Sequence, residues 1–165
     1  MNDTFCEHIV QRKTRPTDIA IKVLSIAAIV VLALSSVILG FLMIFVAFIF
    51  GTIAVLFIFP KLKVEYEYSL LNHDLNVDVI YNRAKRKHLL SIDLKEAEMI
   101  APRTSHRLDA YHDLVMKDYS TADENATPYA VMCNISQQMN CILFNPDKEM
   151  LSRMESFLPR TLYRD

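Results

Sequence analysis

The stretch VLSIAAIVVLALSSVILGFLMIFVAFIFGTIAVLFIF, from Val23 to Phe59, contains 37 residues and no Asp, Glu, Lys, Arg or His. A bilayer core is about 30 Å thick and a helix rises about 1.5 Å per residue, so roughly 20 apolar residues cross it once. The stretch is too long for one crossing and suits two. Gly40 stands near its middle, where a turn costs little. We therefore predict a membrane segment over 18–60, with transmembrane helices over 19–39 and 41–59.

Basic residues flank both outer ends of this predicted hairpin, and the turn around Gly40 has none. They are Arg12, Lys13, Arg15 and Lys22 before the first helix, and Lys61 and Lys63 after the second. The positive-inside rule then predicts a multi-pass protein of the cell membrane with both termini in the cytoplasm. A cleaved signal peptide is the competing interpretation, because the small residues Ala33, Ser35 and Ser36 follow a basic segment and an apolar run.

Composition excludes several classes of function. Residues 1–22 carry four basic and three acidic residues, and residues 61–165 carry 14 basic and 16 acidic ones, so nucleic acid is not expected as a partner. With two glycines in the chain, a glycine-rich phosphate-binding loop is absent.

The three cysteines, Cys6, Cys133 and Cys141, lack metal-binding spacing, which favours reduced thiols. Cys133 and Cys141 would form a redox-sensitive pair if they lay on neighbouring strands. We expect no cofactor.

Residues 1–17 are predicted to be a cytoplasmic tail. Thr4 and Glu7 have capping-box spacing, which suggests a short interfacial helix with Phe5, Ile9 and Val10 on one face; a frayed tail is the alternative. Pro16 should interrupt any such helix, and Thr17 or Asp18 should cap the first membrane helix. Pro60 should end the second.

Beyond the membrane segment, residues 61–165 have the pattern of a cytoplasmic β domain. Val64, Tyr66 and Tyr68 alternate with polar residues, which is typical of a half-buried strand. Alternation and turn residues predict seven antiparallel strands, over 64–69, 75–80, 88–93, 99–102, 114–119, 129–134 and 141–144, with a hairpin tip over 82–87. Asn145 is predicted to cap a final amphipathic helix over 146–158. The predicted fold class is an α+β membrane protein.

This order of seven strands and one C-terminal helix is that of a pleckstrin-homology (PH)-like barrel. The segments VEYEY (64–68), RAKRK (83–87) and EMIAP (98–102) resemble an uncharacterised family of bacterial two-helix membrane proteins, a domain of unknown function, over nearly the whole chain. The resemblance implies a PH-like cytoplasmic domain behind a membrane hairpin. It implies no catalytic residues, because the family has no established activity, and a fold alone does not fix a function.

Six cations are the candidate site residues, as contacts to the membrane surface: Arg83, Lys85, Arg86 and Lys87 at the predicted hairpin tip, and Lys61 and Lys63 at the membrane exit. Each cation near an anionic leaflet contributes about 1 kcal/mol. The alternative interpretation of the tip is a solvated loop kept polar against aggregation.

Three His–Asp pairs occur in polar connections: His73 with Asp74, His106 with Asp109, and His112 with Asp113. None has a recognised ligand spacing, so we assign no catalytic or metal-binding residue. The function predicted first is a non-enzymatic, membrane-anchored interaction module, whose partners are the lipid bilayer, anionic lipid headgroups, and a protein partner or a second copy of the chain. The alternatives are a membrane-bound hydrolase or transferase using the region of His106 and His112, and a small accessory subunit of a membrane complex.

Overall fold

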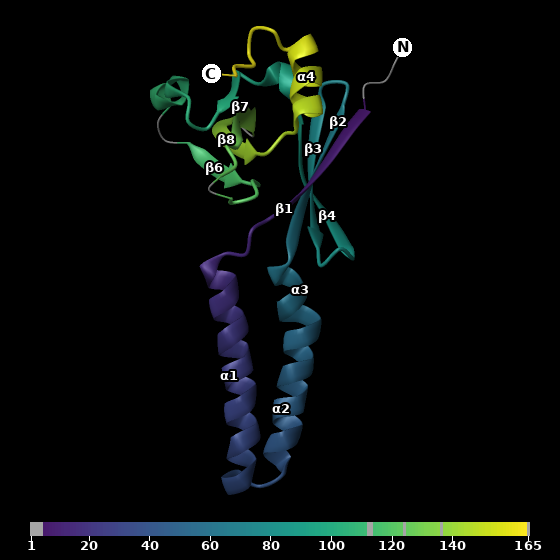
Figure 1. The fold of residues 1–165 in the computed structure, drawn as a ribbon, viewed down its shortest axis with the longest axis vertical. Coiled ribbons are helices and arrows are strands. Elements are labelled where there is room, and N and C mark those ends of the chain that lie inside the picture. Colours follow the sequence, from purple (N-terminus) through teal and green to yellow (C-terminus); the bar gives the residue numbers. More distant parts are fainter. Residues whose placement is uncertain (1–4, 112–113, 124, 136, 165) are drawn as a thin grey trace. The chain divides into compact units, whose positions relative to one another are not determined.

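The computed structural model describes residues 5–111, 114–123, 125–135 and 137–164, and Figure 1 labels its elements. The chain divides into two compact units. The helical unit comprises residues 14–64 and 81–84, and the sheet unit comprises the described residues up to 13, 65–80 and those from 85 onward. Each unit is described by itself.

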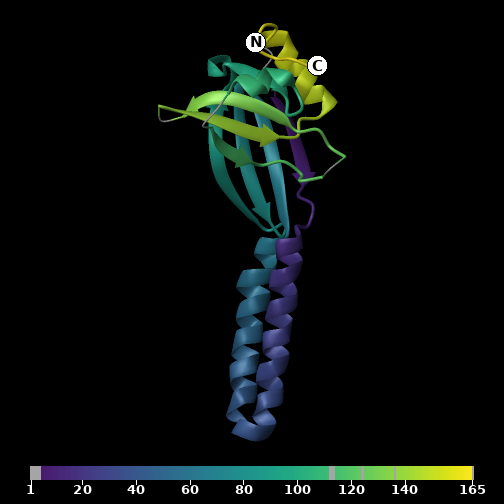
Figure 2. The same cartoon turned by 90° about the vertical axis from the view of Figure 1, so that its left-hand side faces the viewer.

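The helical unit is a hairpin of two long helices (Figure 2). Helix α1 (Pro16–Leu39) has 24 residues, and a second continuous helix of 21 residues runs through α2 (Leu42–Ile53), the π-helical segment η1 (Ala54–Ile58) and α3 (Phe59–Leu62). The chain reverses at Gly40, whose φ of 92° is readily adopted by glycine. The predicted hairpin and its turning point are confirmed, and both helices are long and apolar enough to cross a membrane.

The outer ends of both helices differ from the prediction. Pro16 begins α1 instead of interrupting it, since a proline at the first helical position loses no helical hydrogen bond. The N-cap residue is Arg15, not Thr17 or Asp18; Asp18 stands three positions later and takes part in a capping box, its Oδ2 accepting the Arg15 N–H at 3.0 Å. Pro60 lies inside α3, and the second helix ends at Leu62. The preceding π turn accommodates the proline ring, which would clash with the carbonyl four residues before it in a regular helix.

Small residues let the two helices pack closely. Ala47 and Ala54 are buried, and a Cβ atom added to Gly51 would lie 3.8 Å from Ile29 Cδ1 of α1. Most other side chains of both helices are exposed; those of Val37 and Ile38 are each 86% exposed. The helices therefore bury a narrow seam and present the rest of their apolar surface outward.

The sheet unit contains two four-stranded sheets. The first has the order β1 (Phe5–Gln11), β2 (Val64–Leu71), β3 (Asp74–Tyr81) and β4 (Lys85–Asp93). The second has the order β5 (Met99–Pro102), β7 (Tyr129–Ile135), β8 (Gln138–Phe144) and β6 (Val115–Asp118). Two short 3-10 helices, η2 (Leu94–Glu96) and η3 (His106–Ala110), and one α-helix, α4 (Lys148–Phe157), complete it.

The N-terminal segment is a strand, so the predicted interfacial helix is wrong over residues 5–11. Strand β1 pairs antiparallel with β2, from Phe5 opposite Leu71 to Gln11 opposite Glu65. Cys6 and Val10 point inward and are buried, as period-2 alternation requires. Thr4, half of the expected capping box, lies outside the described residues. The described chain therefore has eight strands where seven were predicted.

Two further strand predictions need correction. Strand β4 begins at Lys85, so the hairpin tip is only the turn around Asn82 and Arg83, whose φ values of 49° and 56° are both positive, as in a type I′ turn. Strand β6 pairs in parallel with β8, where an antiparallel pairing was predicted. The eight strands form two sheets, not the single seven-stranded antiparallel sheet or barrel.

The second sheet is covered on both faces. On one face Phe144 of β8 meets Tyr68 of β2 edge-to-face, with ring centroids 5.5 Å apart, which joins the two sheets. The opposite face carries Met99, Ala101, Ala130, Met132, Cys141 and Leu143, against which the partly buried Leu108, Tyr111, Leu114 and Tyr163 pack. The C-terminal segment also bonds to β5, because Ile100 N–H donates to Thr161 O and Ile100 O accepts from Tyr163 N–H, both at 2.8 Å.

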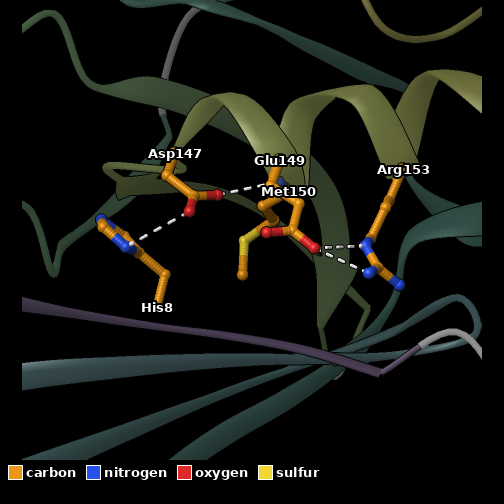
Figure 3. Close-up of polar contacts among 5 residues, drawn as sticks. All are labelled: His8, Asp147, Glu149, Met150 and Arg153. Atoms are coloured by element: carbon orange, nitrogen blue, oxygen red, sulfur yellow. Dashed lines mark hydrogen bonds and ion pairs between the residues drawn. The ribbon is translucent and has the colours of Figure 1, made fainter.

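Helix α4 contacts β1 (Figure 3). It begins at Lys148, two residues later than predicted, and Asp147 caps it by accepting the Met150 N–H at 2.7 Å. The other Asp147 oxygen lies 3.6 Å from His8 Nδ1 of β1. Asn145, the predicted cap, instead accepts the Thr121 N–H at 2.8 Å. The predicted amphipathic face is confirmed at Met150 and Met154, which are fully buried.

Candidate functional site

A groove of about 590 Å³ lies in the helical unit, between the start of α1 and the end of the second helix. Its apolar lining comes from both helices and comprises Ile19, Val23, Ile26, Val55, Phe59, Pro60 and Leu62. Its polar lining comprises Thr14, Asp18, Lys22, Lys63 and Asn82. This helix-end groove thus combines an apolar interior with two lysines, which is the chemistry of a surface that meets both acyl chains and phosphate groups.

The structure brings three of the six predicted cations into the helical unit: Lys61, Lys63 and Arg83. The Asn82 N–H donates to Lys63 O at 2.9 Å, so the turn that carries Arg83 is held at the exit of the second helix. Lys85, Arg86 and Lys87 lie on β4 in the sheet unit. The sequence analysis predicted that Arg83, Lys85, Arg86 and Lys87 lie together on one loop. In the structure Arg83 is in the turn, and the other three cations are on β4. Lys22 of the groove is a further cation, which the sequence analysis used only for orientation.

Arg86 is engaged by an acidic side chain, because its guanidinium forms an ion pair with Glu67 of β2. Glu67 is only 4% exposed. Removal from water raises the pKa of Glu67, a hydrogen bond with Glu7 raises it further, and the charge of Arg86 opposes this shift. On the adjoining strands His88 Nδ1 lies 2.7 Å from Asp78 Oδ1. The charge of Arg86 is therefore largely compensated within the sheet. Arg86 and Glu67 are 19 positions apart, so the local sequence does not reveal this ion pair.

Of the two histidines of the hydrolase hypothesis, the structure describes only His106, and this residue does not lie in a pocket. His106 is fully exposed on η3, and its Nδ1 lies 3.2 Å from Asp109 Oδ2, one turn along the same short helix. Water surrounds such a pair and weakens the electrostatic effects on which catalysis depends. His112 and Asp113 lie outside the described residues.

The cysteines are buried free thiols. Cys133 stands opposite Asn140 and Cys141 opposite Met132, so the two side chains point to opposite faces of the sheet and do not pair. Burial raises the pKa of Cys133 to about 11 and also raises that of Cys141. Cys6 shares its strand with His8, whose partner is Asp147, but burial and then Asp147 and Glu149 raise the pKa of this thiol as well. A nucleophilic cysteine needs the opposite shift.

The remaining His–Asp pair gains a third member through folding. His73 is in the turn before β3, Asp74 is the first residue of β3, and Asp93 at the end of β4 lies beside them. The sequence analysis missed Asp93 because 19 residues separate it from Asp74 and no motif links them.

Comparison with models of protein families gives a match over nearly the whole chain. Residues 2–164 match the model of a family described as "Bacterial PH-like domain (DUF6106)", a match that includes both the hairpin and the sheets. No curated protein and no solved structure matches the chain.

Proposed function

The chain belongs to this family of bacterial PH-like domains of unknown function, and from that premise we propose that it is a membrane-anchored, non-enzymatic interaction module. The hairpin holds it in the cell membrane, and the PH-like domain acts by contact with a protein or with the membrane surface. A PH-like fold suits such a role because its sheets offer strand edges and grooves as docking surfaces.

The observation that carries the proposal is the exposure of the two long helices. A helix in the core of a soluble protein buries its apolar side chains, but only 6% and 11% of the residues in the apolar windows of these helices are buried. Lipid is the solvent in which such a surface is stable, and a helix satisfies its own backbone hydrogen bonds there. No ionisable residue occurs from Val23 to Phe59, which argues against an ion or proton pathway.

Charge supports the orientation in which both termini are cytoplasmic. Cations stand at both outer ends of the hairpin and none near Gly40. In this orientation Lys22, Lys63 and the turn with Arg83 lie at the level of the cytoplasmic headgroups. Each contributes about 1 kcal/mol near an anionic leaflet, and together they hold the exit of the hairpin at the surface.

Cysteine labelling in intact cells tests the anchor and its orientation. The native thiols are buried, so single cysteines replacing Phe41, beside the turn, and Lys85, on β4, give the signal. We expect an impermeant maleimide added outside to label the first position and not the second. Labelling at Lys85 alone would overturn the orientation, and recovery of the chain in the soluble fraction would overturn the anchor. The intact mass of the purified chain decides the signal-peptide interpretation, since cleavage near Ala33 would remove β1 and most of α1.

A specific observation also favours a second candidate, an accessory subunit of a membrane complex. Strand β1 lies at the edge of the first sheet, and its outward face exposes Phe5 and Ile9, with Leu71 opposite Phe5 on β2. Exposed apolar residues at a sheet edge are typical of a protein contact. A photo-crosslinking residue in place of Ile9 should capture a partner chain if this candidate is right, and a matched residue in place of Glu65 on β2 controls for random capture.

A further inference from the structure

We propose that His73, Asp74 and Asp93 form a binding site for a divalent transition metal, with Zn²⁺ as the best-matched ion. One nitrogen of the histidine and one oxygen of each carboxylate lie within 4.8 Å of one another. All three residues belong to the sheet unit. The site is separate from the helix-end groove and does not depend on the proposed function.

The backbone holds these residues together. Asn72 and His73 form the two-residue turn between β2 and β3, which the positive φ of Asn72, 56°, makes possible. The His73 carbonyl oxygen accepts the Leu94 N–H at 2.9 Å, and this bond ties the turn to the end of β4. Asp74 and Asp93 are the first residue of β3 and the last residue of β4. The ligands are thus carried by ordered strand ends rather than by a long loop, which favours a defined geometry.

The imidazole of His73 has a nitrogen that needs a partner. Its Nδ1 is shielded from solvent and makes no hydrogen bond among the residues that the structure describes. The nearest carboxylate oxygen, Asp74 Oδ1, lies 4.0 Å away, beyond hydrogen-bond distance. A buried nitrogen without a hydrogen bond is unfavourable, whereas a lone pair on Nδ1 can bind a metal directly. The orphaned atom points to coordination independently of the carboxylates.

Asp93 has the support that metal ligands usually have. Its Oδ1 accepts the Lys95 N–H at 2.9 Å, which fixes the orientation of the carboxylate. Hydrogen bonds of this kind around a ligand set its direction and strengthen metal binding. Half of the Asp74 side chain is exposed, so an ion can reach the site from solvent.

The ligand types indicate which ion fits. Two carboxylates balance the charge of a divalent cation, and one imidazole shifts the preference from Mg²⁺ or Ca²⁺ toward Zn²⁺ and its neighbours. Around tetrahedral Zn²⁺, with bonds of about 2.0–2.2 Å, ligand atoms lie about 3.3–3.5 Å apart. The aspartate side chains therefore turn inward by about 1 Å on binding, which rotation about their own bonds allows. Three protein ligands leave a fourth position for water or for a carboxylate of a partner.

Titration of the full chain with ZnCl₂ tests the site, after purification in detergent and removal of metal with a chelator. We expect one Zn²⁺ per chain by calorimetry, and a higher melting temperature of the loaded protein because the ion binds only the folded site. His73→Ala and Asp93→Asn should each weaken binding at least about 100-fold, more than the loss of a supporting contact costs. His106→Ala is the matched control, because His106 has one carboxylate partner instead of two, and it should bind as the unchanged chain does.

Asp93→Asn keeps an oxygen that can accept the Lys95 N–H, so it separates loss of a ligand from loss of structure; circular dichroism verifies its fold. The proposal is overturned if the unchanged chain takes up no Zn²⁺, or if His73→Ala and Asp93→Asn bind it as tightly as His106→Ala does.

Discussion

The two units of this chain use the same apolar residue types in opposite ways. In the helical unit, Val37 and Ile38 are each 86% exposed, whereas in the sheet unit Leu70 and Leu75 are fully buried. Hydrophobic burial explains the sheet unit, whose apolar residues leave water for a close-packed interior. It cannot explain the helical unit unless lipid is its solvent. The difference teaches that exposure has to be judged against the solvent of each part.

The largest effect is expected from removing an aromatic ring in the sheet unit. Phe144→Ala should destabilise that unit by about 3–5 kcal/mol, because Phe144 is fully buried and its ring packs on Tyr68. Phe48→Ala is the matched control in α2, where the ring is exposed, and it should change stability by less than about 0.5 kcal/mol. Denaturant unfolding followed by tyrosine fluorescence measures this, since the chain has no Trp and its seven tyrosines lie between residues 66 and 163. Equal losses in both variants would break the comparison.

A charge placed on an exposed apolar position distinguishes the two solvents. Val31→Asp in the middle of α1 should lower membrane insertion by about 2.5–3.5 kcal/mol, because a carboxylate at the centre of a membrane helix is poorly solvated. Met116→Asp on β6 also replaces an exposed apolar side chain, but in water it should cost less than about 0.5 kcal/mol. An insertion assay for the first and denaturant unfolding for the second give the two values. If Val31→Asp inserts normally, α1 is not surrounded by lipid.

A smaller effect is expected at the start of α4. Asp147→Ala should cost about 1 kcal/mol, because it removes the oxygen that accepts the Met150 N–H. Asp147→Asn retains an acceptor and loses only the charge that faces His8 (Figure 3). Because both side chains are about one-third exposed, this second variant should cost less than about 0.5 kcal/mol. Thermal unfolding of the two variants separates the cap from the ion pair; equal losses would assign the stabilisation to charge.

The sequence predicted local features well. A charge-free run longer than one crossing, with a glycine at its middle, was sufficient for the hairpin and its turn at Gly40. Most strands after the hairpin were also found, because alternation of apolar and polar residues is visible within a single segment.

Features that depend on distant partners were not predictable in the same way. Phe5 and Ile9 are spaced as on one face of a helix, and only pairing with β2, about 60 positions later, makes that segment a strand. The parallel pairing of β6 with β8 likewise depends on the fold. The same holds for the candidate sites: the Arg86–Glu67 pair and the approach of Asp93 to His73 join residues about 20 positions apart. Pairing of strands, and not any motif, creates them.

The last prediction concerns Glu67, which is almost fully buried in the sheet unit, whereas the stretch from Val23 to Phe59 in the helical unit contains no ionisable residue. Its pKa in the folded chain is raised above the ordinary value of 4.5, mainly by loss of hydration. Between 4.5 and this higher value the folded state binds more protons than the unfolded state, so stability falls as pH rises through that window. Glu67→Gln should remove this part of the slope. Arg86→Gln should extend the fall to higher pH, because Arg86 is the charge that lowers the pKa of Glu67. Denaturant unfolding at a series of pH values from 4.5 upward tests both, and a slope that is the same in all three chains would mean that Glu67 is hydrated and that the sheet does not shield it.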